Sequence, residues 1–158
     1  MKIVFFVRRF HPQIGGVETH VLELCKELIR TGHKIIIIAE QFDLTDEQEK
    51  IALPTELKEV KVIRIKTGQN EFLKKFRIWY GLYKIRKLFC KASIIHCHDV
   101  FFWYFPFRLI YPFKKVYVTF HGYETKFPPS KRAIIIRKIS EWLSSGNICV
   151  GDYINKWY

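Results

Sequence analysis

The chain has 158 residues, 49% of them hydrophobic, and its 27 Lys and Arg against 15 Asp and Glu give a net charge of +12 at pH 7. A chain this apolar can bury a core, which excludes a disordered basic tail, and its length suits one ordinary domain. Aromatic residues make up 16% of it. Together with the positive charge, they leave nucleic acid, an anionic membrane surface and phosphorylated small molecules open as partners.

Strand and helix patterns alternate along the chain. They predict a strand over 2–7, a helix from Val17 to a C-cap at Gly32, strands over 33–39 and 60–65, a long helix over 72–90, a strand over 93–97, a loop over 101–113, a strand over 116–120, a helix over 134–143, a strand over 147–150 and a helix from Asp152. This alternation is typical of an α/β, doubly wound, mostly parallel sheet with helices on both faces. We expect one Rossmann-like domain over residues 1–158.

No segment indicates export or membrane insertion. The apolar run from Ile3 to Val7 is too short for a signal peptide, and the stretch Val100–Phe113 is too short and too interrupted to span a bilayer. We therefore expect a cytoplasmic chain. Four cysteines lie in apolar patterns without a CxxC pair, so buried free thiols in a reducing compartment are expected for Cys25, Cys90, Cys97 and Cys149.

Parallel sheets bind ligands beyond the carboxyl ends of their strands, which directs attention to the segments that follow each strand. The first carries Gly15-Gly16 between a buried strand and a helix. A helix N-terminus favours an anion, and glycines let a phosphate approach the backbone. A tight turn without a ligand is the alternative. The third glycine of a dinucleotide motif is absent, although Glu40 after the second strand could serve as the ribose-binding acid of an NAD site.

Histidines follow two later strands. On a strand, His96 and His98 share one face while Cys97 points to the other, so these three side chains cannot converge on one metal ion. The chain also lacks an Asp-x-Asp pair, and we expect no metal. His121, with Gly122 behind it, is well placed to contact a bound hydroxyl or phosphate. A turn histidine with a structural role is the alternative.

The positive charge is concentrated in residues 61–91, which hold ten bases and one acid. The long helix predicted there has an aliphatic stripe suited to packing on the sheet, formed by Ile78, Leu82, Ile85 and Phe89. A second, aromatic stripe lies about 120° away, with basic side chains beside it. We expect an anionic membrane to be contacted by Phe72, Lys75, Phe76, Trp79, Tyr83 and Arg86. Alternatively, the aromatic stripe packs under the 101–113 loop. No nucleic-acid recognition motif is present.

Several segments together resemble the amino-terminal half of family 4 glycosyltransferases, enzymes with the two-domain GT-B fold. The most specific block runs from Phe10-His11-Pro12 through the turn Gly15-Gly16-Val17-Glu18 to Thr31-Gly32-His33. The segments Ile94–His98, Val118–Gly122 and Ser140–Val150 are similar to later parts of that domain, except that Gly151 replaces the family's usual serine. The resemblance covers the whole chain in order.

The resemblance implies a retaining, metal-independent glycosyltransferase that uses a nucleotide-sugar as donor and needs no other cofactor. Gly15 and Gly16 would approach the donor's diphosphate, and His121 would lie beside the transferred sugar. The acceptor side is expected to include Arg8, His11, Gly122, Lys131 and Arg132, although the last two could simply be solvated. Lipid-linked or membrane-proximal acceptors at the cytoplasmic membrane face, in glycan or glycolipid synthesis, are also implied.

In that family a carboxyl-terminal domain holds most of the nucleotide, and these 158 residues carry none of its motifs. We therefore expect this chain to be the acceptor-side domain, partnered by a donor-binding domain in cis or in trans and inactive alone. Two other hypotheses remain open. One is a non-catalytic module that docks on a membrane or a partner through the basic helix, and the other, less favoured, is an NAD-binding fold.

Overall fold

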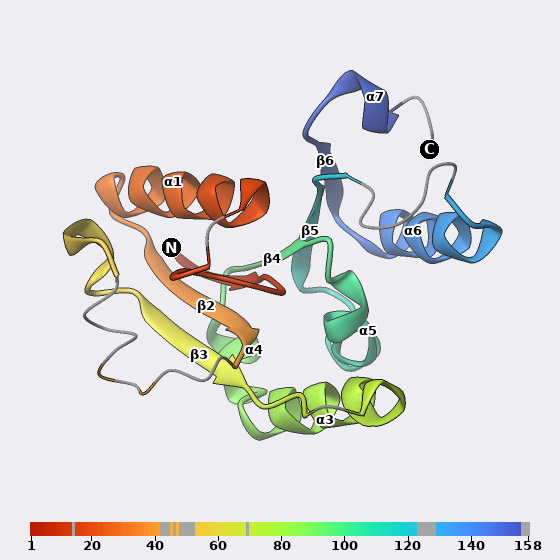
Figure 1. The fold of residues 1–158 in the computed structure, drawn as a ribbon, viewed down its shortest axis with the longest axis horizontal. Helices are drawn as coiled ribbons and strands as arrows, with labels where there is room; N and C mark the ends of the chain where they lie inside the picture. Colours follow the sequence, from red (N-terminus) through yellow and green to blue (C-terminus); the bar gives the residue numbers. More distant parts are fainter. Residues whose placement is uncertain are drawn as a thin grey trace.

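The computed structural model describes residues 1–13, 15–41, 45, 47, 53–68, 70–122 and 129–155. Its elements are β1 (Lys2–Phe6), α1 (Gly16–Arg30), β2 (Lys34–Glu40), η1 (Thr55–Leu57), β3 (Lys61–Ile65), α3 (Glu71–Lys84), α4 (Lys87–Lys91), β4 (Ile94–His98), α5 (Phe101–Ile110), β5 (Lys115–Phe120), α6 (Lys131–Leu143), β6 (Gly146–Cys149) and α7 (Asp152–Asn155). The six strands form one parallel sheet in the order β3-β2-β1-β4-β5-β6. The predicted Rossmann-like α/β fold is confirmed (Figure 1).

The sheet separates two apolar layers, because successive side chains of a strand point to opposite faces. On β1, Phe5 packs into the layer that contains Val21 and Cys25 of α1. Its neighbour Phe6 packs into the other layer, with residues of α3, α4 and α5 such as Leu82. In Figure 1, α1 lies on one side of the central strands and α3 on the other. Helices thus cover both faces of the sheet, as expected of a doubly wound fold.

Helix α1 begins and ends at the glycines that the sequence singled out. Gly15 is its N-cap, and no side chain caps the first turn. At the other end Gly32 has a φ of 80°, a conformation that favours glycine. The N–H groups of Gly32 and His33 donate to the carbonyls of Ile29 and Leu28, which is the Schellman arrangement. The C-cap itself is Thr31, one residue before the predicted position, and Gly32 follows it in the left-handed conformation.

The long helix predicted over 72–90 is wrong in its length. Helix α3 ends at Lys84, and the shorter α4 begins at Lys87. Between them the N–H groups of Ile85 and Arg86 donate to carbonyls three residues back instead of four, which tightens the turn. The aliphatic stripe nevertheless packs on the sheet as predicted, because its members Ile78, Leu82, Ile85 and Phe89 all lie in the same core layer.

Residues 101–110, predicted as a loop, form the helix α5 with Pro106 inside it. A proline has no N–H to donate to the carbonyl four residues earlier, which here belongs to Phe102. The indole N–H of Trp79 donates to that carbonyl over 3.1 Å, and the rings of Trp79 and Phe102 lie 5.1 Å apart. Trp79 of α3 therefore satisfies the carbonyl that the proline leaves without a helical donor, and it joins α3 to α5.

Replacing Trp79 by alanine is expected to lower the free energy of unfolding by about 2–3 kcal/mol, because the indole's packing and its hydrogen bond are both lost. The matched change at Phe76, which is 49% exposed on the same stripe, should cost less than about 1 kcal/mol. Urea unfolding of the two variants measures the difference. Equal losses would show that the link between α3 and α5 does not stabilise the fold.

Two further expectations from the sequence are corrected. All four cysteines are free, but Cys90 and Cys149 are exposed while Cys25 and Cys97 are buried. Cys90 lies on the outer side of the short α4, and Cys149 lies on β6, which is an edge strand. Helix α6 begins at Lys131, three residues before its predicted start, because the Ser130 side chain caps it by accepting from the N–H of Ala133.

Candidate functional site at the carboxyl edge of the sheet

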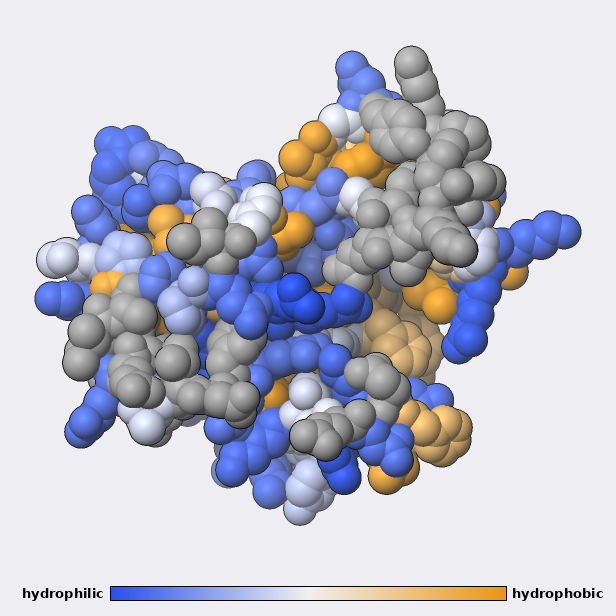
Figure 2. Space-filling view, in the orientation of Figure 1, coloured by the Kyte–Doolittle hydropathy of each residue, from blue (hydrophilic) through white to orange (hydrophobic). Residues whose placement is uncertain are grey.

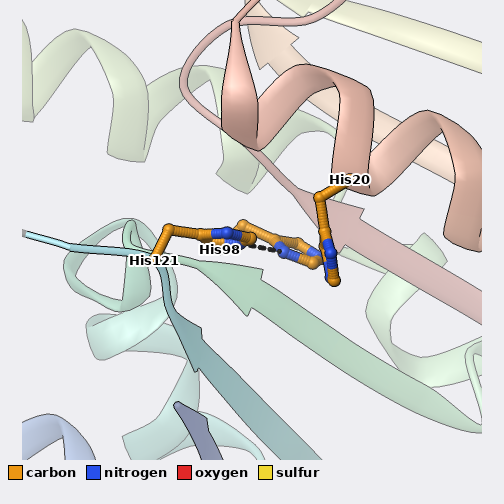
Figure 3. Close-up of side chains that lie close together, drawn as sticks. All are labelled: His20, His98 and His121. Carbon is orange, nitrogen blue, oxygen red and sulfur yellow. Dashed lines mark hydrogen bonds between the residues drawn. The ribbon is translucent and has the colours of Figure 1, made fainter. Parts of the chain in front are cut away.

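The carboxyl ends of β1, β4 and β5 bring chemistry-bearing side chains together beside the N-terminus of α1. A hydrogen bond of 2.9 Å joins Nδ1 of His98 to Nε2 of His121 (Figure 3). Two residues before each of these histidines, a bond of 2.7 Å joins Nε2 of His96 to the hydroxyl of Thr119. His96 and His98 are on β4, Thr119 is on the neighbouring parallel strand β5, and His121 directly follows β5. His96 and His98 share a face while Cys97 enters the opposite core layer, as the sequence predicted.

The backbone of His121 is also held in place. Asp99 adopts a φ of 57°, a left-handed conformation that costs a residue with a side chain about 1–2 kcal/mol. In this conformation its two carboxylate oxygens each lie 3.2 Å from the N–H of His121. The guanidinium of Arg137 donates to the carbonyl of the next residue, Gly122, and stacks on Phe120. His121 is thus held through its ring and its own N–H, and the residue after it is held through its carbonyl.

Burial keeps the imidazoles of this cluster neutral. The pKa of His96 and that of His121 are each lowered to about 4, mainly by desolvation and to a smaller extent by nearby histidines. The pKa of His98 is lowered well below its usual range by the same desolvation and then by its histidine neighbours. A neutral imidazole has one donor and one acceptor nitrogen. At neutral pH the cluster therefore offers hydrogen bonds to a ligand without carrying positive charge.

His20 is the functional candidate that sequence reasoning missed. It projects from α1 toward the pair, and its ring centre lies 4.9 Å from that of His121 and 6.1 Å from that of His98 (Figure 3). One nitrogen from each of the three rings lies within 4.8 Å of the others. Such imidazoles could ligate an ion such as Zn²⁺. Sequence reasoning weighed a metal site only at the adjacent residues His96, Cys97 and His98, whose side chains do not converge.

Next to Gly15-Gly16 in sequence, the first residues of α1 line a pocket of about 320 Å³, which we call the glycine pocket. Its lining residues are Arg8, Arg9, Val17, Glu18, His98 and Asp99, and not the two glycines themselves. A Cβ added to Gly16 would meet no atom within 4 Å, so the space beside this backbone is open to a ligand. The same Cβ at Gly15 would press on the flexible Glu18 side chain. The N–H groups of the first helical turn, which have no acceptor within the helix, make this the anion-binding end of α1.

Replacing Gly16 by alanine is expected to leave the free energy of unfolding unchanged or to raise it by up to about 1 kcal/mol, because the Cβ meets no atom and glycine is a poor helix former. The same methyl group would occupy the space beside the turn, and affinity for a nucleoside diphosphate should fall at least about tenfold. Gly32→Ala, with its positive φ, is the reverse control: it should lower stability and leave that affinity intact. If Gly16→Ala kept the wild-type affinity for the nucleoside diphosphate, the proposed contact of Gly16 with a phosphate would be wrong.

The other predicted residues divide between the site and the surface. Arg8 lines the glycine pocket. His11 is half-buried, and its carbonyl accepts a 2.6 Å hydrogen bond from Arg64 of β3. Lys131 and Arg132 are exposed in the first turn of α6 and do not line this pocket, so the structure does not bring them to the histidines. They remain candidates only for contact with a part of the acceptor that lies outside this pocket.

Only part of the membrane-facing stripe predicted on α3 is exposed. Phe72, Phe76 and Tyr83 are 74%, 49% and 50% exposed. Two cations accompany them: the ammonium of Lys75 lies over the rings of Phe72 and Phe76, and the guanidinium of Arg86 lies 3.9 Å from the ring centre of Tyr83. Trp79 departs from the prediction, because it is half-buried against α5. Within the described residues no helix is long and apolar enough to cross a membrane.

Comparison with known proteins identifies the family. The family model for Glycosyltransferase Family 4 matches residues 14–158. The chain belongs to this family. The resemblance inferred from the glycine turn and the strand-end histidines is therefore confirmed. Glu40, the candidate ribose ligand of an NAD site, is instead paired with Lys74 at 3.1 Å, with 15% of its side chain exposed. This pairing removes the main support for the NAD hypothesis.

Relatives agree with the family assignment. The chain is 30% identical over 94 residues to a subunit of human phosphatidylinositol N-acetylglucosaminyltransferase, a match that covers 58% of this chain and 19% of that protein. Its fold is similar to sucrose-phosphate synthase from Thermosynechococcus elongatus, with a TM-score of 0.62 at 14% identity over 94% of this chain and 46% of that one. A putative UDP-N-acetylglucosamine 2-epimerase from Listeria monocytogenes gives 0.55 at 15% identity, over 92% and 37%. The chain thus spans less than half the length of each.

Proposed function

We propose that this chain is the acceptor-side domain of a retaining, metal-independent glycosyltransferase that uses a nucleotide-sugar. The observation that carries the proposal is the rigidly held His121, which lies with His98 at the carboxyl edge of the sheet where the glycine pocket also opens. A neutral His121 can exchange a hydrogen bond with a hydroxyl of the transferred sugar. The uncapped N-terminus of α1 can stabilise the negative charge that develops on the leaving diphosphate. In other enzymes a bound metal ion stabilises this charge.

A second domain completes this proposal. The carboxyl edge of one Rossmann-like sheet supplies one wall of the site, and a donor-binding domain, in cis or in trans, would supply the other. The test is a transfer assay with labelled nucleotide-sugars. We expect no appreciable transfer by the 158-residue chain alone, and transfer when the donor-binding domain is present. Measurable transfer by the chain alone would contradict the two-domain account.

The acceptor is proposed to be lipid-linked or membrane-proximal, and the protein to work at the cytoplasmic face of a membrane. The exposed aromatic rings of α3 with Lys75 and Arg86 beside them support this, since an interfacial helix combines such residues on anionic lipid. The human relative's name includes phosphatidylinositol, which points the same way. Vesicle sedimentation tests it: anionic vesicles should bind more chain than neutral ones, and equal binding would remove the electrostatic argument.

The same surface favours a second candidate, a non-catalytic module that docks on a membrane or on a partner protein. The human relative is one subunit of its enzyme by name, which supports partner proteins for either candidate. The two differ in one outcome. A docking module binds vesicles or partners and transfers no sugar under any combination of domains, whereas the proposed enzyme does both.

A further inference from the structure

Arg8 and Arg9, which line the glycine pocket, also line a second cavity of about 370 Å³ on the side of the sheet covered by α3 and α5. We call it the basic pocket. Its polar wall consists of Arg8 and Arg9 after β1, Glu40 at the end of β2, and Lys74 and Lys75 of α3. Figure 2 shows hydrophilic side chains gathered over the middle of this face, between α1 and α3. A volume of this size lies within the range of small-molecule sites.

The charge of the basic pocket is strongly unbalanced. Among the described residues that line it, four are cations and one, Glu40, carries a carboxylate, which is paired with Lys74 at 3.1 Å. That pair holds the Lys74 ammonium at the pocket wall, where it is 24% exposed. Arg9 and Lys75 of this wall can attract an anion, and the planar guanidinium of an arginine matches the oxygens of a phosphate. The chemistry of this wall therefore fits a phosphate group.

The opposite wall is apolar. Trp79, Phe102 and Trp103 line it, and the exposed rings of Phe72 and Phe76 continue outward along α3. In Figure 2 apolar side chains lie toward the outer ends of α3 and α5. A ligand that fills both walls carries a phosphate next to an apolar part.

We propose that the basic pocket binds the phosphate group of the acceptor, which makes the acceptor a phosphorylated molecule, either a phospholipid headgroup or a soluble phosphate ester. The inference rests on the proposed function, because only an enzyme that transfers sugar has an acceptor. The basic pocket and its lining residues do not depend on that function. Because the two arginines line both pockets, a phosphate bound here lies beside the glycine pocket. The hydroxyl of the same molecule can then reach toward His121 while its apolar part extends over Phe76.

Binding of glycerol 3-phosphate to the chain tests the proposal. The indole N–H signals of Trp79 and Trp103 report on the pocket in ¹H–¹⁵N spectra, and that of the exposed Trp142 serves as an internal control. We expect saturable shifts of the first two signals only. The variant Arg9→Gln with Lys75→Gln should raise the dissociation constant about tenfold or more. The control Lys87→Gln with Lys91→Gln, which removes the same charge from exposed positions on α4, should change it less than about twofold.

A second arm separates the two sources of phosphate. Vesicles of phosphatidylcholine, with or without phosphatidylglycerol, are sedimented with the same proteins. If glycerol 3-phosphate binds, a soluble phosphate ester is sufficient for the pocket. If only the phosphatidylglycerol vesicles bind, and the pocket variant weakens this binding while the α4 control does not, the ligand is a lipid headgroup.

The proposal is overturned if neither probe binds, if both double variants lose binding equally, or if a nucleoside diphosphate displaces glycerol 3-phosphate from the pocket, which would assign the pocket to the donor. No donor sugar enters these measurements. A protein that transfers no sugar would therefore leave the binding result standing, and the failure of the pocket would leave the transfer proposal untouched.

Discussion

Lowering the pH from 6.5 to about 4 is expected to lower the free energy of unfolding by several kcal/mol, through the histidines at the carboxyl edge of the sheet. The pKa of His96 falls from 6.5 to about 4 in the folded chain, mainly by burial. A depressed folded pKa means that the unfolded chain binds protons more readily. The stability is therefore fully present above pH 6.5 and is lost as the pH falls toward 4, about 3 kcal/mol for His96 alone.

His98 and His121 add to this effect, since the pKa of each is also lowered by burial. Urea unfolding at a series of pH values measures it. The variant His96→Gln keeps a side chain that can hydrogen-bond to Thr119 but cannot be protonated, so its stability should fall less steeply with acid. The matched variant His33→Gln, just beyond the other end of α1, should follow the wild type. Parallel curves for His96→Gln and the wild type would contradict the assignment.

Replacing His121 by alanine is expected to lower the rate of sugar transfer by about a hundredfold or more in the protein that carries the donor-binding domain. The hydrogen bond with His98 holds the ring of His121, and the Asp99 carboxylate accepts from its backbone N–H. Alanine leaves no side-chain group to contact the sugar. His121→Asn keeps a short polar side chain and should lose less. Initial rates at saturating donor and acceptor measure the loss.

His33→Ala serves as the control for this loss, because His33 lies outside the cluster; its rate should match that of the wild type. Thermal unfolding shows whether each variant is folded at the assay temperature. A folded His121→Ala protein that transfers sugar at the wild-type rate would remove His121 from the mechanism, and the family assignment would stand without it.

The sequence predicts the fold well because its signals are local. Each buried strand is a short apolar run, and Gly32 ends α1 with a conformation that glycine favours. The opposite orientation of Cys97 and its histidine neighbours follows from the alternation of a strand. The break after Lys84 carries no such signal, because the apolar spacing continues through it as the turn tightens.

Features that depend on distant partners could not be predicted in the same way. Pro106 argues against a helix in isolation, and the carbonyl that it leaves without a helical donor accepts a hydrogen bond from Trp79, 27 residues before the proline. By spacing His20 flanks the apolar stripe of α1, three residues after Val17 and four before Leu24, but only the packing of α1 on the sheet brings its ring centre within 4.9 Å of that of His121. The basic pocket is likewise lined by residues at or near β1, β2, α3 and α5, so no single motif in the sequence predicts it.

The most direct test of the central claim is a transfer assay with a panel of labelled nucleotide-sugars, in the presence of EDTA and of phospholipid vesicles, with the protein that carries the donor-binding domain. The account predicts that label from at least one donor moves to a phosphorylated acceptor, that the anomeric configuration is retained and that EDTA leaves the rate unchanged. No transfer from any donor, or transfer that EDTA abolishes, would contradict it.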